Sequence, residues 1–460
     1  MKVQYVSIRP TEKAEELGLY AFTPELLASV GARYSRNNEG LDAIASKIDF
    51  DNTDKSVDSI FKMLDYGHAS IADMTPIALF IDDITLFAAY YLWTLSPTAG
   101  GQECSTRYIK LDASSVATAE ELGIPEHLKS EYDNFISDAF QNYQDCLTAW
   151  ANIANTNPGV TKIPQDLLES NEPKAKKQVE RMKRNYAFDR ARVHLPVTAK
   201  TGVMMVQSAR AWTNMSAHLQ SHSLRELNLI GKEIEEKLKI GAPRLVKHCR
   251  PTEAIEAFYR HEQKYEKAYC KMKHKFLPSA NQCDTNLKVH SNKKLDLDAL
   301  NFRKNRYSPF GHTISQIPVT FSWEGITFGE IRDLNRHRTG SKYCSLVPIG
   351  FYGATDEVPI ESTNESSKII ELYTDFEQST LKSRELMKEY AEYIYFTNLG
   401  HKYYFEHTTT ADKFLYEMEL RTGVGAHYKY AEHCHKMLEL WFQKYPQSKG
   451  LIFEGSAEPE

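Results

Sequence analysis

Two short segments carry residue types that could bind an anionic, ring-bearing ligand. Residues 336–341 read RHRTGS, and residues 103–108 read ECSTRY. Arginine grips a phosphate or a planar polar edge through a fork of donors, and a Gly-Ser turn lets the backbone approach a ligand closely. The second segment adds a carboxylate, hydroxyl donors and one cation in a short run. Taken singly, the first could instead be a helix C-terminus and the second a solvated turn.

Other candidate residues lie far from these segments. Arg192 stands in DRARVHLP and Arg421 in MELRTG, and an arginine that is buried has to face an anion. Cys104 lies inside the second segment, but no base is paired with it in the sequence, so we interpret it as structural and not as a nucleophile. The run HCH at 433–435 points its side chains to different faces of a helix, so we expect no metal site there.

Length and composition limit the classes of protein. A chain of 460 residues predicts two domains. The 56 Lys and Arg against 61 Asp and Glu give a net charge of −5, which argues against nonspecific nucleic-acid binding. The longest apolar stretch carries two aspartates and the N-terminus does not resemble a signal peptide, so we expect no membrane span. Seven cysteines without CxxC spacing favour the reducing cytoplasm.

The order of elements occurs twice along the chain. A Gly-His turn, GHAS at 67–70 and GHTI at 311–314, precedes an apolar run of β character in each half. Helical periodicity then predicts long helices at 126–154, 208–238, 366–396 and 410–441. We therefore predict a duplicated α+β protein with one lobe at 1–250, a helical linker at 251–295 and a second lobe at 296–460.

The duplicated pattern resembles the flavin-dependent thymidylate synthases (ThyX), whose signature is an RHRxxSxNExSxRY-type run. Neither half has the whole signature. The second half keeps its beginning, as Arg336, His337, Arg338 and Ser341, and lacks its tail. The first half has Thr94–Ser96 roughly in place of RHR and keeps the tail as Glu103, Ser105, Thr106, Arg107 and Tyr108.

The downstream motifs of the family are divided in the same way. The first half matches the ARxxLP segment through Arg192, the NAR element through Arg210 and Asn214, and the GHxS turn through Ser70. His222 resembles the histidine that family members carry after their LR element. The LR element itself is kept only in the second half, as Leu420 and Arg421.

The resemblance implies a function for each group of residues. The flavin would be held by Arg336, His337, Arg338, Ser341, Ser70, Arg210, Asn214 and His222. The nucleotide would be held by Glu103, Ser105, Thr106, Arg107, Arg192 and Arg421. Arg421 and Arg336 would be catalytic. Family members form homotetramers with sites between subunits, so two complementary half-sites predict one complete site between the lobes, and a homodimer that imitates the tetramer.

The activity implied is the reductive methylation of dUMP to dTMP, with FAD as cofactor and NADPH and methylenetetrahydrofolate as co-substrates. The resemblance also implies an antiparallel sheet flanked by long helices in each lobe. Two alternatives stay open. Asp333 stands where the family usually has Gln, which would suit a flavin- and folate-dependent alkylation at C5 of another pyrimidine nucleotide. Loss of the Asn-Glu pair from the second half would suit a non-catalytic flavin- or nucleotide-binding protein.

Overall fold

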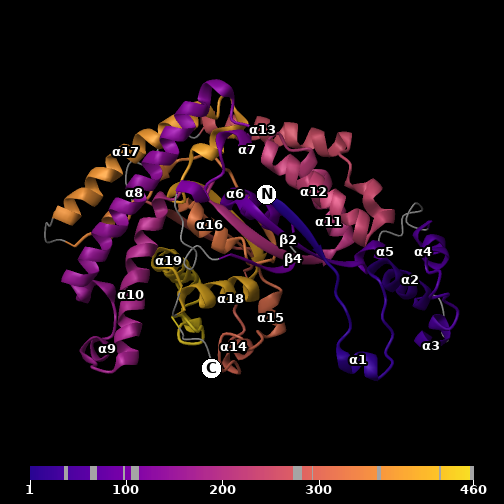
Figure 1. The fold of residues 1–460 in the computed structure, drawn as a ribbon. Helices are drawn as coiled ribbons and strands as arrows, with labels where there is room; N and C mark the ends of the chain where they lie inside the picture. The colour runs from indigo at the N-terminus through magenta and orange to yellow at the C-terminus, as the bar shows by residue number, and fades with distance from the viewer. Residues whose placement is uncertain are drawn as a thin grey trace. The chain divides into compact units, whose positions relative to one another are not determined.

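The fold is taken from a computed structural model of the chain. It describes residues 1–35, 40–62, 70–96, 99–104, 113–272, 282–292, 294–359, 364–423 and 426–455. The chain forms two compact units, the first from residues 1–129 and 198–264 and the second from 130–197 and 265–460. Figure 1 follows the chain by colour through both. The units differ from the predicted lobes, because residues 130–197 belong to the second unit although they precede the second half of the sequence.

The first unit is built on a four-stranded antiparallel sheet of order β1-β2-β4-β3. Its strands are β1 (Lys2–Val6), β2 (Pro76–Thr85), β3 (Gly100–Glu103) and β4 (Lys200–Ser208). Strands β2 and β4 each run directly into a helix, α6 (Leu86–Leu95) and α11 (Ala209–Gln220). The last strand residue caps each helix, since the Thr85 and Ser208 hydroxyls accept from Ala88 N and Ala211 N.

The second unit repeats this plan. Its antiparallel sheet has the order β5-β6-β9-β7, with β8 also paired to β9. The strands are β5 (Asp284–Val289), β6 (Pro318–Thr327), β7 (Ser341–Cys344), β8 (Gly350–Phe351) and β9 (His401–Thr410). The central pair keeps one register in both units: Pro76 faces Ser208 and Thr85 faces Lys200, as Pro318 faces Thr410 and Thr327 faces Lys402. The α+β class and the tandem duplication are therefore confirmed.

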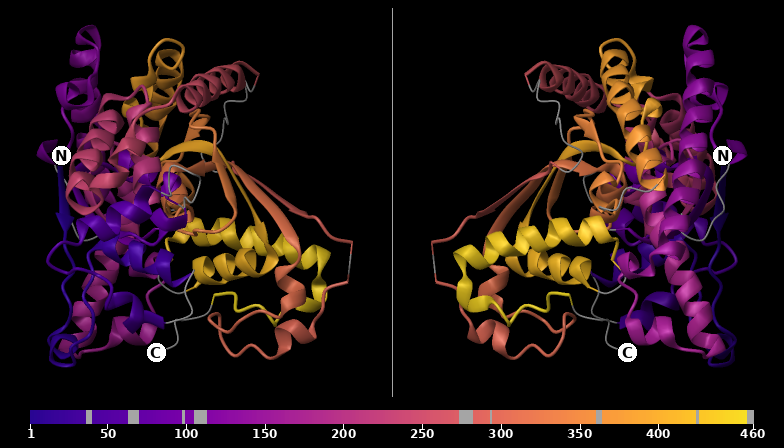
Figure 2. Two further views of the ribbon diagram at one scale, coloured as in Figure 1. Left: turned by 90° about the vertical axis from the view of Figure 1, so that its right-hand side faces the viewer. Right: turned by 90° about the vertical axis from the view of Figure 1, so that its left-hand side faces the viewer.

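Two of the long helices predicted from periodicity are each broken into two. Residues 208–238 form α11 and α12 (Arg225–Gly241), and residues 410–441 form α18 (Ala411–Thr422) and α19 (Tyr428–Lys444). The breaks fall at polar or glycine-bearing runs, SHSL and GVGAH, which periodicity alone does not detect. In the second unit α18 and α19, drawn in yellow, lie along one face of the sheet (Figure 2).

The helices α8 (Lys129–Thr156) and α10 (Pro173–Ala191) belong to the second unit. The ring of Trp150 on α8 meets Tyr186 on α10 edge-on at 5.9 Å, and Lys368 of α17 (Asn364–Leu386) pairs with Asp145 of α8 at 2.9 Å. After α10 the backbone of residues 193–197 bonds to residues 397–400, through Val197 N to the Thr397 carbonyl among others. These bonds place Arg192, at the end of α10, inside the second unit.

The segment predicted as a linker contains regular structure. Helix α13 (Glu253–Met272) covers its first part, and β5 is an edge strand of the second sheet. Strand β5 has only one fully buried residue, Val289, so its polar sequence gave no strand signal. Its counterpart in the first sheet is β1.

Shorter elements complete the described chain. The helices are α1 (Glu12–Glu16), α2 (Pro24–Tyr34), α3 (Gly40–Ala45), α4 (Asp54–Phe61), α5 (Ser70–Asp73), α7 (Ala119–Leu122), α9 (Gln165–Glu169), α14 (Asp298–Asn301), α15 (His312–Ser315) and α16 (Phe328–Leu334). Short 3-10 turns include Arg192–His194 and Ala391–Phe396. Over the residues described, no helix has the length and apolar character needed to cross a membrane.

Candidate functional site

The RHR segment follows a short, strongly capped helix of the second unit. The Thr327 hydroxyl accepts from Glu330 N and the Glu330 carboxylate accepts from Thr327 N, which fixes the start of α16. After Leu334 the chain turns through 335–340 into β7. Gly340 has φ +64°, and a Cβ there would lie 2.0 Å from the Thr408 carbonyl oxygen. Only glycine therefore lets this loop pass so close to β9.

Arg421 on α18 binds this loop. Its Nε donates to Nε2 of His337 at 2.8 Å and its Nη2 donates to the Asp333 carbonyl at 3.1 Å. The guanidinium carbon also lies 5.3 Å from the centre of the Tyr430 ring. Burial lowers the pKa of His337 to about 3, so His337 is neutral at pH 7. Since Nε2 accepts, the ring proton is on Nδ1.

Asp333 is the carboxylate on which the arginines of the second unit converge. Burial alone would raise its pKa, but Arg336, Arg421 and Arg192 outweigh burial and lower it. An oxygen of Asp333 lies 3.7 Å from Nη1 of Arg336. The structure thus brings Arg192, from the segment between α10 and β4, to the same place as two arginines from the second half of the sequence.

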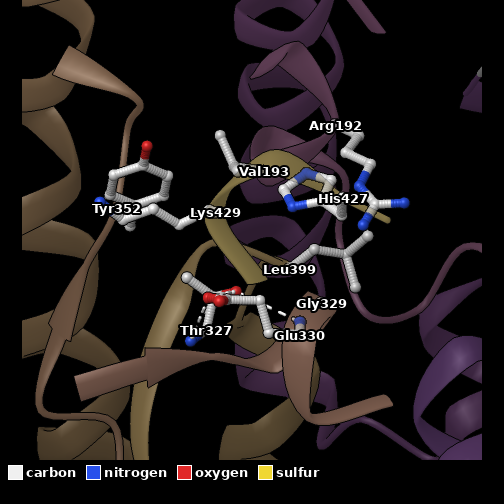
Figure 3. Close-up of a pocket in the computed structure, with 9 residues that line it drawn as sticks. All are labelled: Arg192, Val193, Thr327, Gly329, Glu330, Tyr352, Leu399, His427 and Lys429. Carbon is white, nitrogen blue, oxygen red and sulfur yellow. Dashed lines mark hydrogen bonds between the residues drawn. The ribbon is translucent and has the colours of Figure 1, made fainter. Parts of the chain in front are cut away.

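A small cavity lies beside this cluster, at the end of β6. It measures about 10 Å³, the room for a single water. Figure 3 shows its lining, with the Thr327–Glu330 hydrogen bonds dashed. The lining residues are Arg192, Val193, Thr327, Gly329, Glu330, Tyr352, Leu399, His427 and Lys429. Burial and then the charge of Arg192 lower the pKa of His427 to about 4, so Arg192 faces neutral imidazole here.

Glu330 and His433 form a buried ion pair at the base of the same cavity. Nδ1 of His433 donates to Oε1 of Glu330 at 2.8 Å, and both side chains are 2% exposed. Burial disfavours the charged form of each side chain, but the opposite charge of the partner has the larger effect on each pKa. The pKa of Glu330 falls to about 2 and that of His433 rises to about 10. This pair fixes α16 against α19.

A second buried acid lies behind His337. Glu417 on α18 and His407 on β9 are fully buried, and Nδ1 of His407 is 3.2 Å from Oε2 of Glu417. His407 Nε2 donates to the Thr339 carbonyl of the RHR loop at 2.6 Å. Lys342 Nζ donates to the carbonyl oxygen of His337. Side chains from β9 and β7 therefore bond to two backbone carbonyls of the loop.

The first unit has no such charged cluster at the matching positions that the structure describes. By the shared strand register and helix starts, Met205 corresponds to His407, Met215 to Glu417 and Leu219 to Arg421. All three apolar side chains are fully buried. Ser96 stands in place of His337 and donates to Gln207. Of the two units, the second alone keeps this set of ionisable residues.

The residues predicted from the first half fall in several places. Glu103 ends β3 and is half-buried. Ser105, Thr106 and Arg107 lie outside the described residues, so their predicted contact with a nucleotide stays a prediction. The same holds for the composite site that depends on them.

The remaining predicted flavin ligands lie in the first unit. Ser70 begins α5, and Arg210 on α11 forms an ion pair with Asp73 at 2.9 Å. Asn214 is exposed on α11. The His222 ring meets Tyr91 and Tyr259 edge-on at 5.0 and 5.2 Å, and burial lowers its pKa to about 4. No described contact joins these four residues to one another, and their roles remain predictions.

Sequence reasoning missed Glu330, His407 and Glu417. One signal was available, because Glu417 precedes Arg421 by four residues and so lies on the same face of α18. The three residues of the HCH run have different surroundings: His433 pairs with Glu330, His435 with Glu454, and Cys434 is buried. Among the residues described, no group of three or more His, Cys, Asp or Glu could hold a metal ion.

Comparisons with known proteins were made for the whole chain. No curated protein matches it. One solved structure, a UMP/dUMP methylase PolB from Streptomyces cacaoi bound with 5-Br dUMP, is 14% identical, with a TM-score of 0.33 over 54% of this chain and 93% of that chain. So loose a likeness supports no argument about this chain. Residues 19–244 match the family described as "Thymidylate synthase complementing protein". This match lies in the first half of the chain, and it supports the resemblance that the sequence motifs show to the flavin-dependent thymidylate synthases.

Proposed function

We propose that this protein is a flavin-dependent methyltransferase that converts dUMP to dTMP, with FAD bound and with methylenetetrahydrofolate and NADPH as co-substrates. The observation that carries the proposal is the convergence of Arg192, Arg336 and Arg421 on Asp333 in the second unit. The family resemblance alone would not favour particular residues. The cluster supports these three, because it gathers cations that are far apart in the sequence.

The electrostatics of the cluster suit a nucleotide phosphate. The carboxylate of Asp333 lies among four guanidinium groups, so cations outnumber it here although the chain as a whole carries −5. Guanidinium forks match the oxygen atoms of a phosphate, and charge-assisted hydrogen bonds of this kind are worth about 1.5–3 kcal/mol each. Arg192 is half-buried and acts on Asp333 together with Arg336 and Arg421, so we assign it to the phosphate.

Arg421 is suited to act on the pyrimidine ring. His337 and the Asp333 carbonyl engage its Nε and Nη2, and no described residue accepts a hydrogen bond from Nη1. A guanidinium held in this way can donate a hydrogen bond from Nη1 to a carbonyl of the pyrimidine ring. Polarising that carbonyl makes C5 of the uracil more nucleophilic, and a donor that is already oriented needs no reorganisation as charge develops.

The RHR loop offers donors that fit an anionic flavin dinucleotide. Arg336 and Ser341 are exposed and Arg338 is half-buried, so cations and a hydroxyl meet solvent along one loop. We assign these residues and His337 to the FAD. When bound, the reduced flavin supplies the hydride that completes the methyl group. The chain's own part is to hold the nucleotide, to polarise its ring and to keep the loop in place.

The test begins with the purified protein and its absorbance, which reveals flavin. Tritium release from [5-³H]dUMP is then measured with methylenetetrahydrofolate and NADPH. We expect release that depends on both co-substrates and that falls at least tenfold in Arg421→Lys, which keeps the charge but loses the Nε donor. Arg181→Lys, on the same unit but in the polar part of α10, is the control. No flavin and no release would refute the proposal.

Asp333 favours a second candidate, methylation at C5 of another pyrimidine nucleotide. A carboxylate lies in the cluster where the family usually carries the amide of Gln, and a carboxylate accepts hydrogen bonds but cannot donate them at pH 7. It would therefore prefer a base edge that donates. Tritium release from dUMP, UMP and dCMP, each labelled at C5, separates the candidates. Flavin binding with no nucleotide-dependent oxidation of NADPH would point to the non-catalytic alternative.

A further inference from the structure

We propose that Glu417 and His407 are positioning residues: together they fix the RHR loop and the orientation of His337, and through His337 they aim the guanidinium of Arg421. The kinetic consequence rests on the proposed function. The orientation of His337 does not, so it can be tested separately.

His407 connects the buried acid to the loop. Its Nδ1 is 3.2 Å from Oε2 of Glu417, and its Nε2 donates to the Thr339 carbonyl at 2.6 Å. Thr339 is two residues beyond His337 in the loop. The hydrogen bond to Thr339 therefore ties the backbone of the loop to β9, and the same imidazole lies against the carboxylate of Glu417 on α18, the helix that also carries Arg421.

Glu417 is also the buried counter-charge for the groups around His337. Burial would raise the pKa of Glu417, but His337, His407 and Lys342 outweigh it and lower the pKa. Lys342 in turn donates to the carbonyl oxygen of His337. The same carboxylate counteracts the burial of Arg421, whose pKa is raised by Tyr430, Asp333 and Glu417 together. A buried charge without such compensation would be costly.

The geometry fixes which nitrogen of His337 is protonated. Arg421 Nε donates to Nε2 at 2.8 Å, so the ring has to carry its proton on Nδ1. The negative charge of Glu417 favours a proton on this ring, while burial and the cations Arg421 and Lys342 keep the ring neutral. His337 thus acts as an acceptor of one defined orientation, and Arg421 has to turn its remaining donors away from it.

The first unit supplies the comparison. The positions of His407, Glu417 and Arg421 carry Met205, Met215 and Leu219 there, all fully buried. The fold therefore packs well with apolar side chains at these places. Packing therefore gives no reason for the second unit to keep Glu417 and His407 at these positions. Their joint presence with Arg421 indicates that they serve Arg421.

The decisive variant gives the second unit the residues that the first unit has at these positions. It combines Glu417→Met with His407→Met. We expect the variant to fold, with an unfolding temperature lowered because Arg421 and Lys342 lose a counter-charge. We expect kcat to fall at least tenfold, with KM for the nucleotide changed less than about threefold, because an interaction that is stronger in the transition state is lost. Met215→Leu in the first unit is the matched control and should leave kcat unchanged.

A second measurement needs no turnover. In protein labelled with ¹⁵N-histidine, long-range proton–nitrogen NMR reports the tautomer of each ring, and His337→Gln identifies the His337 signals. We expect the Nδ1–H form in the wild type and its loss in the double variant. If the double variant misfolds, the isosteric Glu417→Gln replaces it in both measurements.

The outcomes are distinct. Wild-type kcat together with an unchanged His337 tautomer in the variant would overturn the proposal. A kcat that falls only in proportion to a lower unfolding temperature, with the tautomer unchanged, would assign these residues a merely structural role and overturn it too. A wild type that never turns over a pyrimidine nucleotide, but in which the variant shifts the tautomer, would refute the proposed function and leave the positioning role supported.

Discussion

Replacing Glu330 by glutamine should destabilise the second unit strongly at neutral pH and only weakly at pH 10. Glutamine keeps the shape of the side chain, and its amide oxygen can still accept from Thr327. It loses the charge that faces His433, whose Nδ1 lies 2.8 Å from Oε1 of Glu330. The substitution therefore isolates the ion pair from the helix cap.

The magnitude follows from the pKa of His433. Glu330 and, after it, Cys283 raise it from 6.5 to about 10, against the opposing effect of burial. At about 1.4 kcal/mol for each pH unit of displacement, the whole shift corresponds to about 5 kcal/mol below pH 6.5, which is an upper bound for the share of Glu330. Breaking a buried ion pair by removing one partner costs about 3–5 kcal/mol in other proteins. The two routes agree, and they correspond to a fall of about 10 °C in the unfolding temperature of the second unit.

The pH dependence has a definite sign. The folded pKa of His433 lies above its unfolded value, so the stabilisation is complete below pH 6.5 and is lost as the pH rises through about 10. The folded pKa of Glu330 lies below its unfolded value, so its share is complete above pH 4.5 and is lost as the pH falls through about 2. The wild type and the variant should therefore differ most between pH 4.5 and 6.5.

Urea unfolding of both proteins at pH 5.5, 7.5 and 9.5 measures this difference. The control is Glu226→Gln in the first unit, where Glu226 accepts from Thr85 N and the Thr85 hydroxyl at 2.8 Å each. It measures the effect of the same substitution at a carboxylate that bonds to the threonine at the start of a helix. A Glu330→Gln penalty below about 1 kcal/mol, or one that is constant from pH 5.5 to 9.5, would show that the buried pair is not charged.

Three further predictions concern the site and the thiols. Arg192→Ala should weaken binding of dUMP by about ten- to a hundredfold in titration calorimetry, because one charge-assisted contact is lost; an unchanged affinity would remove Arg192 from the phosphate site. Asp333→Gln should shift the ratio of kcat/KM for dUMP over dCMP in favour of dUMP, and a constant ratio would separate Asp333 from recognition of the base. A thiol reagent should modify the exposed Cys104 quickly and Cys146 only on unfolding, because burial raises the pKa of Cys146 to about 12; rapid labelling of Cys146, followed by mass spectrometry, would contradict its burial.

The sequence was sufficient for the class of fold and for the duplication. The apolar runs that became β2 and β6 end in Thr85 and Thr327, and each leads into a helix that this threonine caps. Such signals are local, since they depend on side chains within one turn of the helix start. The same is true of the RHR loop, whose Gly340 permits the left-handed turn before β7.

The breaks between paired helices and the strand β5 were not predictable in this way. Apolar residues recur on both sides of 221–224 and 423–427, so periodicity continued across them, although the helices end at Gln220 and Thr422. Strand β5 pairs along β6 through backbone groups that every residue possesses. A polar edge strand lacks the alternation of apolar and polar side chains by which strands are predicted, so it is recognised only by its pairing with β6.

Within the site, the sequence by itself determined which ionisable groups exist and that Arg336, His337 and Arg338 follow one another along a loop. Only the tertiary structure decided that Arg192 shares a unit with Arg336 and Arg421, that Glu330 faces His433, and that Glu417 and His407 lie behind the loop. The physical reason is that a charge is compensated by whatever lies within a few ångströms, and these partners are tens to hundreds of residues apart along the chain. The loop and the helix caps follow from residues that are neighbours in the sequence. The electrostatic potential at Asp333 comes from charges on distant segments, which only folding brings together.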